Sequence, residues 1–251
     1  MKVTIITVCK NAQDTIEETI KSVASQDYKD IEYLIIDGKS TDETLKIINK
    51  YKNKIDNIIS EPDKGIYYAM NKGIKRSTGD LVYFLNSGDL FFDKNTVLNV
   101  VKLFEKNNSD IIYGDIALYE FGNPKKLILR RQNHVSDFFL AHDTIYHQSI
   151  FTKRGIFEKY GKFCTKYKLS ADYEWVLRSI VKNKIPAYHA NLVIAKYLRG
   201  GLSFNEQESF KERLKILPLY FSFFQILLNG LLLWFIYRLV KKIKRDCFSK
   251  G

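Results

Sequence analysis

Residues 60–89 read SEPDKGIYYAMNKGIKRSTGDLVYFLNSGD, and this stretch indicates the fold more clearly than any other part of the chain. Its middle, residues 66–76, has the pattern of a helix, and DLVYFL at 80–85 is the apolar run of a buried strand. Four small polar residues, Asn86 to Asp89, interrupt the apolar run before it resumes. A plain turn would explain the interruption, and so would an ion or phosphate site at the end of a buried strand.

Strand-like and helix-like segments alternate in the same way through the first half of the chain. The pattern predicts strands at 3–8, 31–37 and 55–60, with helical patterns through residues 16–23 and 45–48 between them. Near-continuous apolar strands separated by helices are typical of a parallel sheet that is covered on both faces. We therefore expect an α/β fold.

Beyond residue 95 the pattern is looser. It predicts a helix near 95–106, strands near 110–119 and 126–130, a helix at 170–181 and a late strand at 192–197. We expect one folded domain over residues 1–213 and a tail of different character over residues 214–251.

The tail is first apolar and then basic. Residues 216–237 carry no charged side chain, and KKIKR follows at 241–245. That length would just cross a bilayer core of ~30 Å. It is interrupted by Pro218, Gln225, Asn229 and Gly230, so a broken or interfacial helix pair, or a buried core or dimer helix, would also fit.

Orientation favours one of these alternatives. A span with KKIKR in the cytoplasm would leave residues 1–213 outside the cell, away from nucleotides. We therefore expect the tail to lie in the cytoplasmic leaflet of the inner or plasma membrane, as a peripheral or monotopic attachment. Its basic residues would then sit among anionic headgroups.

Composition limits the partners. The chain of 251 residues has a formal net charge of +12, which suits nucleic acid, an acidic membrane surface or a phosphorylated substrate. We expect no nucleic-acid partner, because no RNP aromatic motif or helix-turn-helix pattern is present. The three cysteines are far apart, so they predict neither a disulfide framework nor a zinc ribbon, and a reduced, cytoplasmic setting fits them best.

Polar residues gather where the predicted strands end. Asn11 follows the first strand, Asp37 ends the second, residues 61–65 follow the third and Asn86 to Asp89 follow the fourth. Ligands of parallel α/β sheets bind at the carboxyl ends of the strands. An Asp beside a Gly is more often a turn than a site, but carboxylates at three neighbouring strand ends of a basic protein indicate a binding site.

Several other classes of enzyme are disfavoured. The chain contains no G-x-G-x-x-G after its first strand and no G-x-x-x-x-G-K-[ST]. These absences disfavour a Rossmann dinucleotide enzyme and a P-loop NTPase. It also contains no H-E-x-x-H and no G-x-S-x-G. His142 and His147 are five residues apart, a spacing that does not suit a metal pair on one helix.

Four segments, in this order along the chain, carry a resemblance to a known family: TIITVCKNA, YLIIDGKSTDET, the block at 60–89 and LSADYEWVLR. In these segments the chain resembles the family 2 glycosyltransferases with a GT-A fold, and most closely the bacterial branch that builds capsule, colanic-acid-like and other surface polysaccharides. The resemblance covers roughly residues 1–205. It implies a GT-A-like mixed, mostly parallel sheet with helices on both faces, to which the C-terminal apolar helical tail is added.

The resemblance also implies where the donor, a nucleotide sugar, is bound. Val8, Asn11 and Asp37 match positions that hold the nucleobase and ribose, and Asp63 matches a position near them. Asn71, on the following helix, at best faces the donor.

The segment NSGD matches the acidic metal motif of the family, which clamps the donor diphosphate through a divalent ion, Mn²⁺ or Mg²⁺. Asp89 would be the metal ligand, with Asn86 and Ser87 on the donor beside it. The family motif commonly carries several carboxylates, whereas this chain keeps only Asp89. The family also often has an aromatic residue where Lys10 stands.

Asp172, in ADYEW, matches the carboxylate that acts as general base in inverting members of the family. An acidic residue is also common in the first turn of any helix, because of the helix dipole. His147, in HQS, would meet the acceptor or the phosphates, with structural packing as the alternative. Arg199 opens RGGLS, which is either a loop closing over the donor or a turn before the final helices.

These observations predict an inverting glycosyltransferase. It would move a sugar from a nucleoside diphosphate sugar, UDP-linked, to a hydroxyl of a glycan or lipid-linked oligosaccharide in bacterial surface polysaccharide synthesis. The competing hypothesis is a catalytically silent scaffold of the same fold that binds nucleotide sugars. The presence of a single carboxylate in the acidic motif favours this hypothesis.

Overall fold

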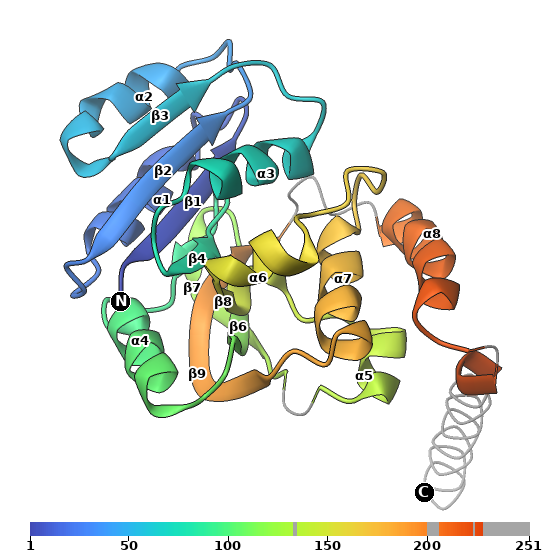
Figure 1. The fold of residues 1–251 in the computed structure, drawn as a ribbon. Helices are drawn as coiled ribbons and strands as arrows, with labels where there is room; N and C mark the ends of the chain where they lie inside the picture. The colour runs from blue at the N-terminus through green and yellow to red at the C-terminus, as the bar shows by residue number, and fades with distance from the viewer. Residues whose placement is uncertain (133–134, 200–205, 223, 228–251) are drawn as a thin grey trace, which may run out of the picture.

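A mixed sheet forms the centre of the protein. The structure, a computed structural model, describes residues 1–132, 135–199, 206–222 and 224–227 (Figure 1). Within these residues the strands follow the order β3-β2-β1-β4-β8-β6-β9-β5, and β7 pairs with β6 outside this path. The expected α/β class is confirmed.

The first half of the chain follows its predicted pattern closely. The strands are β1 (Val3–Cys9), β2 (Ile31–Asp37), β3 (Asn57–Ser60) and β4 (Leu81–Phe84), and each pairs in parallel with its neighbour in the sheet. The connections contain α1 (Ile16–Ala24), α2 (Thr44–Lys50), the 3-10 turn η1 (Lys52–Lys54) and α3 (Ile66–Arg76).

The second half adds the antiparallel pairings. It contains β5 (Leu90–Phe91), α4 (Thr96–Lys106), β6 (Ile111–Glu120), β7 (Asn123–Arg130), α5 (Asp137–His142), η2 (His147–Ser149), β8 (Ile150–Lys153), α6 (Arg154–Tyr160), α7 (Ala171–Val176), the π-helical η3 (Leu177–Lys182), β9 (Ala187–Leu198), α8 (Glu206–Ile216) and η5 (Leu217–Leu219). Strand β8 runs antiparallel to both β4 and β6, whereas β6 and β9 are parallel.

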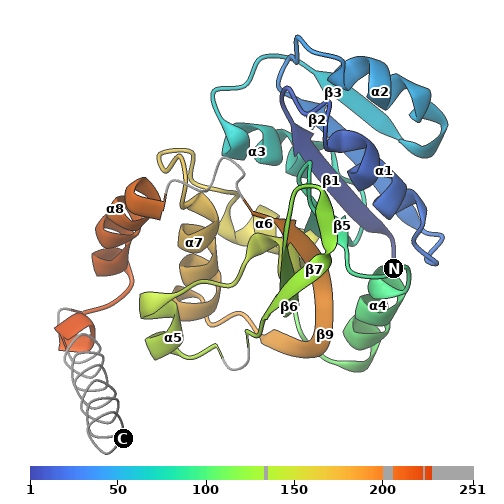
Figure 2. The same ribbon diagram turned by 180° about the vertical axis from the view of Figure 1, so that it is seen from behind.

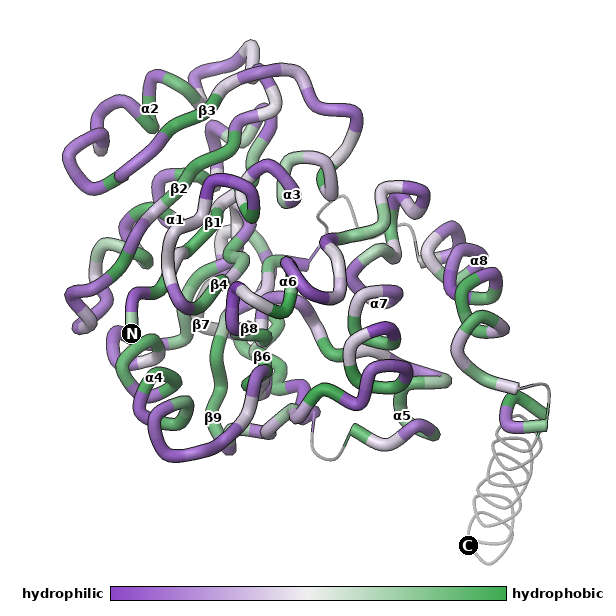
Figure 3. The backbone as a smooth tube through the Cα atoms, viewed as in Figure 1, coloured by the Kyte–Doolittle hydropathy of each residue, from purple (hydrophilic) through white to green (hydrophobic). Residues whose placement is uncertain are grey.

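Alternating side chains of the strands build one core on each face of the sheet. Ile6, Leu34 and Val82 pack with α3, α6 and α7, and Figure 1 shows α3 and α6 in front of the strands. Their neighbours Ile5 and Tyr33 pack with α1, α2 and α4, and Figure 2 shows α1 on that opposite face. Because both faces are covered, the strands are apolar on both, and the central strands are mostly green in Figure 3.

The carboxyl ends of the first strands meet at one edge of the sheet. Gly38 N donates to Cys9 O, Glu61 N donates to Asp37 O and Ser87 N donates to Val8 O. The strand ends that the sequence singled out therefore lie side by side at this edge.

The start of the predicted tail packs on the folded domain. Helix α8, which leads into the tail, is held by Glu212, whose carboxylate accepts the backbone N–H groups of Lys168, Leu169 and Ser170 at 2.9–3.0 Å. Ile216 and Phe221 are buried in the same core as α7. Among the described residues no helix combines the length and apolarity that a membrane crossing requires. Residues 228–251, most of the predicted tail, lie outside the described residues.

Candidate active site

Asp37, at the end of β2, holds two strand ends together. It is fully buried, and its carboxylate accepts hydrogen bonds from the hydroxyls of Ser40 and Ser60 and from the backbone N–H of Ser40. Asn11 contacts the same loop, because its Oδ1 accepts the N–H of Thr41 at 2.9 Å and its own N–H donates to Ser40 Oγ at 2.8 Å. Asn11 and Asp37 thus shape the loops at the predicted base and ribose site.

The NSGD segment is a tight turn against the start of α1. The hydroxyls of Ser87 and Thr15 are 2.8 Å apart, and Gly88 N donates to Thr19 Oγ1 at 3.0 Å. Gly88 has a φ of 96°, a conformation that favours glycine. A Cβ at this position would lie 2.8 Å from Leu198 Cδ2, so the turn also requires glycine for its close approach to β9.

Asp89 is turned away from solvent. Only 3% of the residue is exposed, and its oxygens accept Gln148 Nε2 and the Leu198 backbone N–H, each at 3.1 Å. Burial raises the pKa of Asp89 to about 7, although these two hydrogen bonds act in the opposite direction.

The second acidic residue, Asp172, lies on the first turn of α7 and joins a chain of hydrogen bonds. Its Oδ1 accepts Tyr67 OH and the Tyr173 backbone N–H, both at 2.8 Å. Its Oδ2 lies 3.1 Å from His147 Nδ1. The other ring nitrogen of His147, Nε2, lies 2.9 Å from Asn86 Nδ2. Two predicted site residues from distant parts of the chain, Asn86 and Asp172, are therefore joined through His147.

Asp172 is held in its charged form. Burial alone would raise its pKa, but the hydrogen bond from His147, with the donors Tyr67 and Tyr173 N, outweighs burial and lowers the pKa below its ordinary value. The side chain keeps 18% of its surface exposed. An ionised, partly accessible carboxylate has the charge and access that proton abstraction requires.

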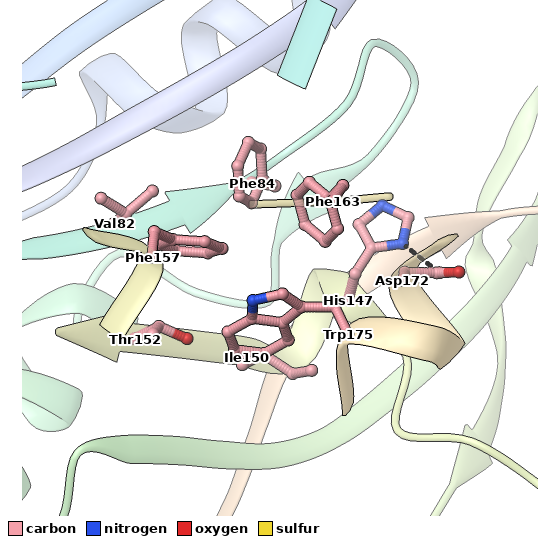
Figure 4. Close-up of a pocket in the computed structure, with 9 residues that line it drawn as sticks. All are labelled: Val82, Phe84, His147, Ile150, Thr152, Phe157, Phe163, Asp172 and Trp175. Atoms are coloured by element: carbon pink, nitrogen blue, oxygen red, sulfur yellow. Dashed lines mark hydrogen bonds and ion pairs between the residues drawn. The ribbon is translucent and has the colours of Figure 1, made fainter. Parts of the chain in front are cut away.

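A small, mostly apolar cavity has His147 and Asp172 in its lining, at one side (Figure 4). Its other lining residues are Val82, Phe84, Ile150, Thr152, Phe157, Phe163 and Trp175. Such a lining suits no diphosphate, so we assign the cavity to packing. The donor would instead lie at the polar strand ends described above.

The remaining predicted residues have different surroundings. Lys72 Nζ lies 2.8 Å from Asp63 Oδ1 and 2.7 Å from Glu61 Oε1, so Asp63 is ion-paired beside the third strand end. The amide of Asn71 binds the backbone N–H and C=O of Phe163 and fixes the loop before α7.

Two further predicted residues lie at the ends of strands. Val8 is buried and its carbonyl accepts Ser87 N. Arg199 follows Leu198, whose N–H reaches Asp89, and its Nη1 lies 3.9 Å from Glu120 Oε1. The loop that Arg199 would open, residues 200–205, lies outside the described residues.

The described residues do not fit a divalent ion as they stand. No group of three or more His, Cys, Asp or Glu side chains among them is placed to hold a metal. Asp89 is the one carboxylate of NSGD, and both of its oxygens have protein partners. Each oxygen keeps a second lone pair, but only 3% of Asp89 is exposed, so a metal would reach it only after the side chain or its cover moved.

Sequence reasoning missed Tyr67 and Gln132. Tyr67 stands in the quoted block, but nothing in GIYYAMNKGI indicates that its hydroxyl reaches Asp172, 105 residues away. The amide of Gln132 brackets the HQS turn, because Oε1 accepts Tyr146 N and Nε2 donates to Ser149 Oγ, each at 2.8 Å. Gln132 N in turn donates to the buried Asp115.

Similarity to known proteins agrees with this geometry. The model of the family described as "Glycosyl transferase family 2" matches residues 4–168. The chain belongs to this family. It is a glycosyltransferase.

A PGL/p-HBAD biosynthesis glycosyltransferase of Mycobacterium bovis is 31% identical over 224 residues, which covers 86% of this chain and 83% of the relative. A second relative, the poly(ribitol-phosphate) beta-N-acetylglucosaminyltransferase TarS of Staphylococcus aureus, is 30% identical over 117 residues, 45% of this chain and 20% of TarS. Neither name refers to capsule or colanic acid, so that branch of the family stays a prediction.

Solved structures support the GT-A fold of the glycosyltransferase. S. aureus TarS 1–349 in complex with UDP-GlcNAc superposes with a TM-score of 0.69 at 19% identity, covering 88% of this chain and 66% of that one. The mannosyltransferase PcManGT of Pyrobaculum calidifontis, in complex with GDP-Man and Mn²⁺, gives 0.65 at 19% identity, with 85% and 64% covered. The chain spans just under two thirds of the length of these two structures.

Proposed function

We propose that this glycosyltransferase transfers a sugar from a nucleoside diphosphate sugar to a hydroxyl group with inversion at the anomeric carbon, and that Asp172 is its general base. The observation that carries the proposal is the position of Asp172. It is ionised and partly accessible, and it is joined through His147 to Asn86 at the strand end where a diphosphate would bind.

The chemistry requires one base and one stabilised leaving group. The acceptor oxygen forms a bond to the anomeric carbon while the bond from that carbon to the diphosphate oxygen breaks. The electron pair leaves with the nucleoside diphosphate, and the acceptor proton passes to Asp172. Because the leaving group is a polyanion, cationic groups must stabilise it, and the net charge of +12 agrees with such a substrate.

We propose UDP as the nucleotide, since TarS, similar in fold, binds UDP-GlcNAc. The test is thermal unfolding of the enzyme with UDP, GDP, CDP or dTDP, each with Mn²⁺ or with EDTA. A ligand that binds only the folded state at 100 times its Kd adds about 2.7 kcal/mol of stability, so a rise in Tm with UDP alone would support the proposal. A rise with GDP alone would assign the donor to GDP sugars.

A divalent cofactor, Mn²⁺ or Mg²⁺, stays part of the proposal through Asp89. PcManGT was solved with GDP-Man and Mn²⁺. The same unfolding experiment with Asp89→Ala tests this point, because a Mn²⁺-dependent shift should disappear in that variant. A shift that is equal with Mn²⁺ and EDTA would mean that the donor binds without a metal.

The acceptor is proposed to be a glycan or lipid-linked oligosaccharide of bacterial surface polysaccharide synthesis, used at the cytoplasmic face of the membrane. Phe210, Leu214, Leu219 and Phe224 are large, exposed apolar side chains that lead into the apolar and basic segment. Deleting residues 228–251 keeps the buried Ile216 and Phe221 in place and should move the protein from the membrane to the soluble fraction. Retained membrane association would reject this attachment.

A catalytically silent scaffold is the second candidate, and the closed surroundings of Asp89 favour it. Such a protein would bind a nucleotide sugar without turning it over. Tight binding of UDP without release of UDP from any UDP sugar, in the presence of extracted membrane lipids, would support this candidate.

A further inference from the structure

His147 lies where it can orient the carboxylate of the proposed base. His147 lies in η2, between the turn that follows β4 and the first turn of α7, and only 14% of its side chain is exposed. Its two ring nitrogens contact one residue from each side, Asn86 and Asp172.

These contacts fix the tautomer of the imidazole ring. With the Asn86 amide in the orientation of this structure, its Nδ2 donates, so Nε2 of His147 accepts and carries no proton. A neutral ring then has its proton on Nδ1, which donates to the carboxylate of Asp172 at 3.1 Å. Both contacts therefore require the same Nδ1–H form.

The backbone beneath His147 is held from several sides. The amide of Gln132 binds both residues that flank the HQ pair, Tyr146 and Ser149, and Tyr83 OH donates to Gln148 O at 2.6 Å. His147 therefore has little freedom to move away from its two partners.

The hydrogen bonds of Asp172 leave one oxygen less occupied. Each carboxylate oxygen has two lone pairs. Oδ1 accepts Tyr67 OH and Tyr173 N, whereas Oδ2 accepts only His147 Nδ1–H among the described residues. The acceptor hydroxyl is thus left with Oδ2.

Asn86 has a free acceptor on the opposite side. Its Nδ2 is used by His147, whereas its Oδ1 is buried and has no hydrogen-bond partner in the described part of the chain. A buried oxygen without a donor is costly, so a hydroxyl or N–H of a bound ligand would satisfy it.

We infer that His147 is a positioning residue. In its Nδ1–H form it orients Asp172 so that Oδ2 faces the acceptor hydroxyl. Through its Nε2 it also links this orientation to Asn86, whose Oδ1 contacts the donor. The inference rests on the proposed function, because it needs Asp172 as the base. His147 itself exchanges no proton in the reaction. It orients the carboxylate as the third group of a catalytic triad orients its base.

Four variants and a double variant test this role. The amide of Asn overlaps Nδ1 of histidine, and the amide of Gln overlaps Nε2. His147→Asn therefore keeps a donor for Asp172 and loses the hydrogen bond with Asn86. His147→Gln keeps the hydrogen bond with Asn86 and loses the one with Asp172. His142→Gln is the matched control, because His142 is exposed on α5 and its Nδ1 lies 2.8 Å from Phe138 O, so it bonds neither Asp89 nor Asp172 through that nitrogen.

Turnover is followed as diphosphate released from whichever of UDP-GlcNAc, UDP-glucose, UDP-galactose or GDP-mannose reacts fastest. We expect His147→Gln to lower kcat about 10- to 100-fold with little change in KM for the donor, because a base displaced by about 1 Å loses that much rate. His147→Asn should retain more activity than His147→Gln, and His142→Gln should match the wild type. His147→Gln added to Asp172→Asn should cost nothing further, because His147 acts only through Asp172.

The outcomes separate the two proposals. Wild-type turnover by Asp172→Asn would reject the proposed base and the role of His147 together. Two results would reject the role of His147 alone, provided that Asp172→Asn lowers kcat. One is a kcat of the double variant that falls by the product of the two single losses. The other is a higher kcat in His147→Gln than in His147→Asn. Unchanged Tm values in the variants show that they are folded.

A spectroscopic measurement is independent of turnover. The chain has four histidines, so single substitutions assign each ring in ¹⁵N-edited NMR spectra. We expect a neutral Nδ1–H ring at His147, with an Nε2 resonance that shifts in Asn86→Ala. An Nε2–H ring at His147 would overturn the inference.

Discussion

Gln148 Nε2 donates to Oδ2 of Asp89 at 3.1 Å, so the residue after His147 closes the carboxylate of the NSGD turn. Two consecutive side chains of one 3-10 turn thus reach the two carboxylates of the site. His147 contacts the proposed base, and Gln148 donates to the carboxylate that is proposed as the metal ligand. The HQS turn therefore contacts both carboxylates of the proposed site.

The first prediction concerns Asp89 in metal-free buffer. Its pKa is raised to about 7 by burial, so the folded state keeps a proton that the unfolded chain loses near pH 4. Stability should therefore fall as the pH rises from 4 to 7. The full cost above pH 7 is up to about 4 kcal/mol, from about three pH units at 1.36 kcal/mol each.

Asp89→Asn removes this charge, and its new Nδ2 can donate to the Oε1 of Gln148, which is buried without a partner in the described residues. The variant should unfold at a higher temperature than the wild type at pH 8, and the two should converge near pH 4. Thermal unfolding at both pH values measures this. Asp27→Asn, at an exposed ion pair with Lys94, is the control, and an equal gain there would contradict the assignment to burial.

The second prediction concerns Glu32, a buried carboxylate at the amino ends of the first strands. Burial opposes its charge, but the hydroxyls of Thr4 and Thr78, the Thr78 backbone N–H and Lys2 Nζ all donate to it and lower its pKa to about 2. A lowered pKa stabilises the fold above the ordinary pKa of 4.5, and this stability is lost as the pH falls from there toward 2.

Glu32→Gln should therefore lower the free energy of unfolding at pH 7 by about 3 kcal/mol, from roughly 2.5 pH units. The deficit should shrink toward pH 2, where the wild-type carboxyl is half protonated. Urea unfolding at the two pH values is the measurement. Glu18→Gln, at an exposed pair with Lys21, should change little, and a pH-independent deficit in Glu32→Gln would refute the linkage.

The third prediction explains a glycine of the block at 60–89. A Cβ on Gly73, in the middle of α3, would lie 2.5 Å from Cγ2 of the fully buried Ile6 on β1. Gly73 thus allows the helix to pack close to the strand. Gly73→Ala should lower stability by about 1–3 kcal/mol through overpacking, although alanine favours helices by up to about 1 kcal/mol.

Gly155→Ala, on α6, is the matched control, because nothing lies within 4 Å of a Cβ there. It should leave stability unchanged or raise it slightly. Denaturant midpoints of both variants decide the point, and equal midpoints would show that the Ile6 contact has no cost.

The sequence was sufficient for the parallel half of the fold and for the strand-end residues. Strands β1, β2 and β4 are apolar on both faces because helices cover both, and this pattern is visible in one sequence. The carboxyl ends of parallel strands necessarily share an edge, so the amino-acid order alone is enough to group Asn11, Asp37 and Asn86. Strand β8, of four residues, was missed because its identity depends on partners far along the chain.

The connections within the site were not predictable in the same way. His147 and Asp172 are 25 residues apart, and their contact depends on how α7 docks. That docking uses Arg178, which contacts Glu174 and the carbonyls of Tyr160 and Gly161. The closure of Asp89 likewise needs groups 59 and 109 residues away. Local patterns carry no information on such distances.

The fourth prediction uses two adjacent tyrosines of α3. Tyr67 is buried and donates to Oδ1 of Asp172 at 2.8 Å, whereas Tyr68 is exposed. Tyr67→Phe removes one of the donors that lower the pKa of Asp172, so that pKa should rise. The base is active when ionised, and the acidic limb of the pH profile of kcat/KM should therefore move to higher pH.

Tyr68→Phe should leave the profile in place, because Tyr68 is not among the hydrogen-bond partners of Asp172. We expect kcat at neutral pH to fall by less than in Asp172→Asn, since the carboxylate keeps His147 and Tyr173 N as donors. The measurement is diphosphate release between pH 4 and 9, with Tm recorded at each pH. If the acidic limb moves equally in both variants, or in neither, the pH dependence of turnover does not report Asp172, and another group is the base.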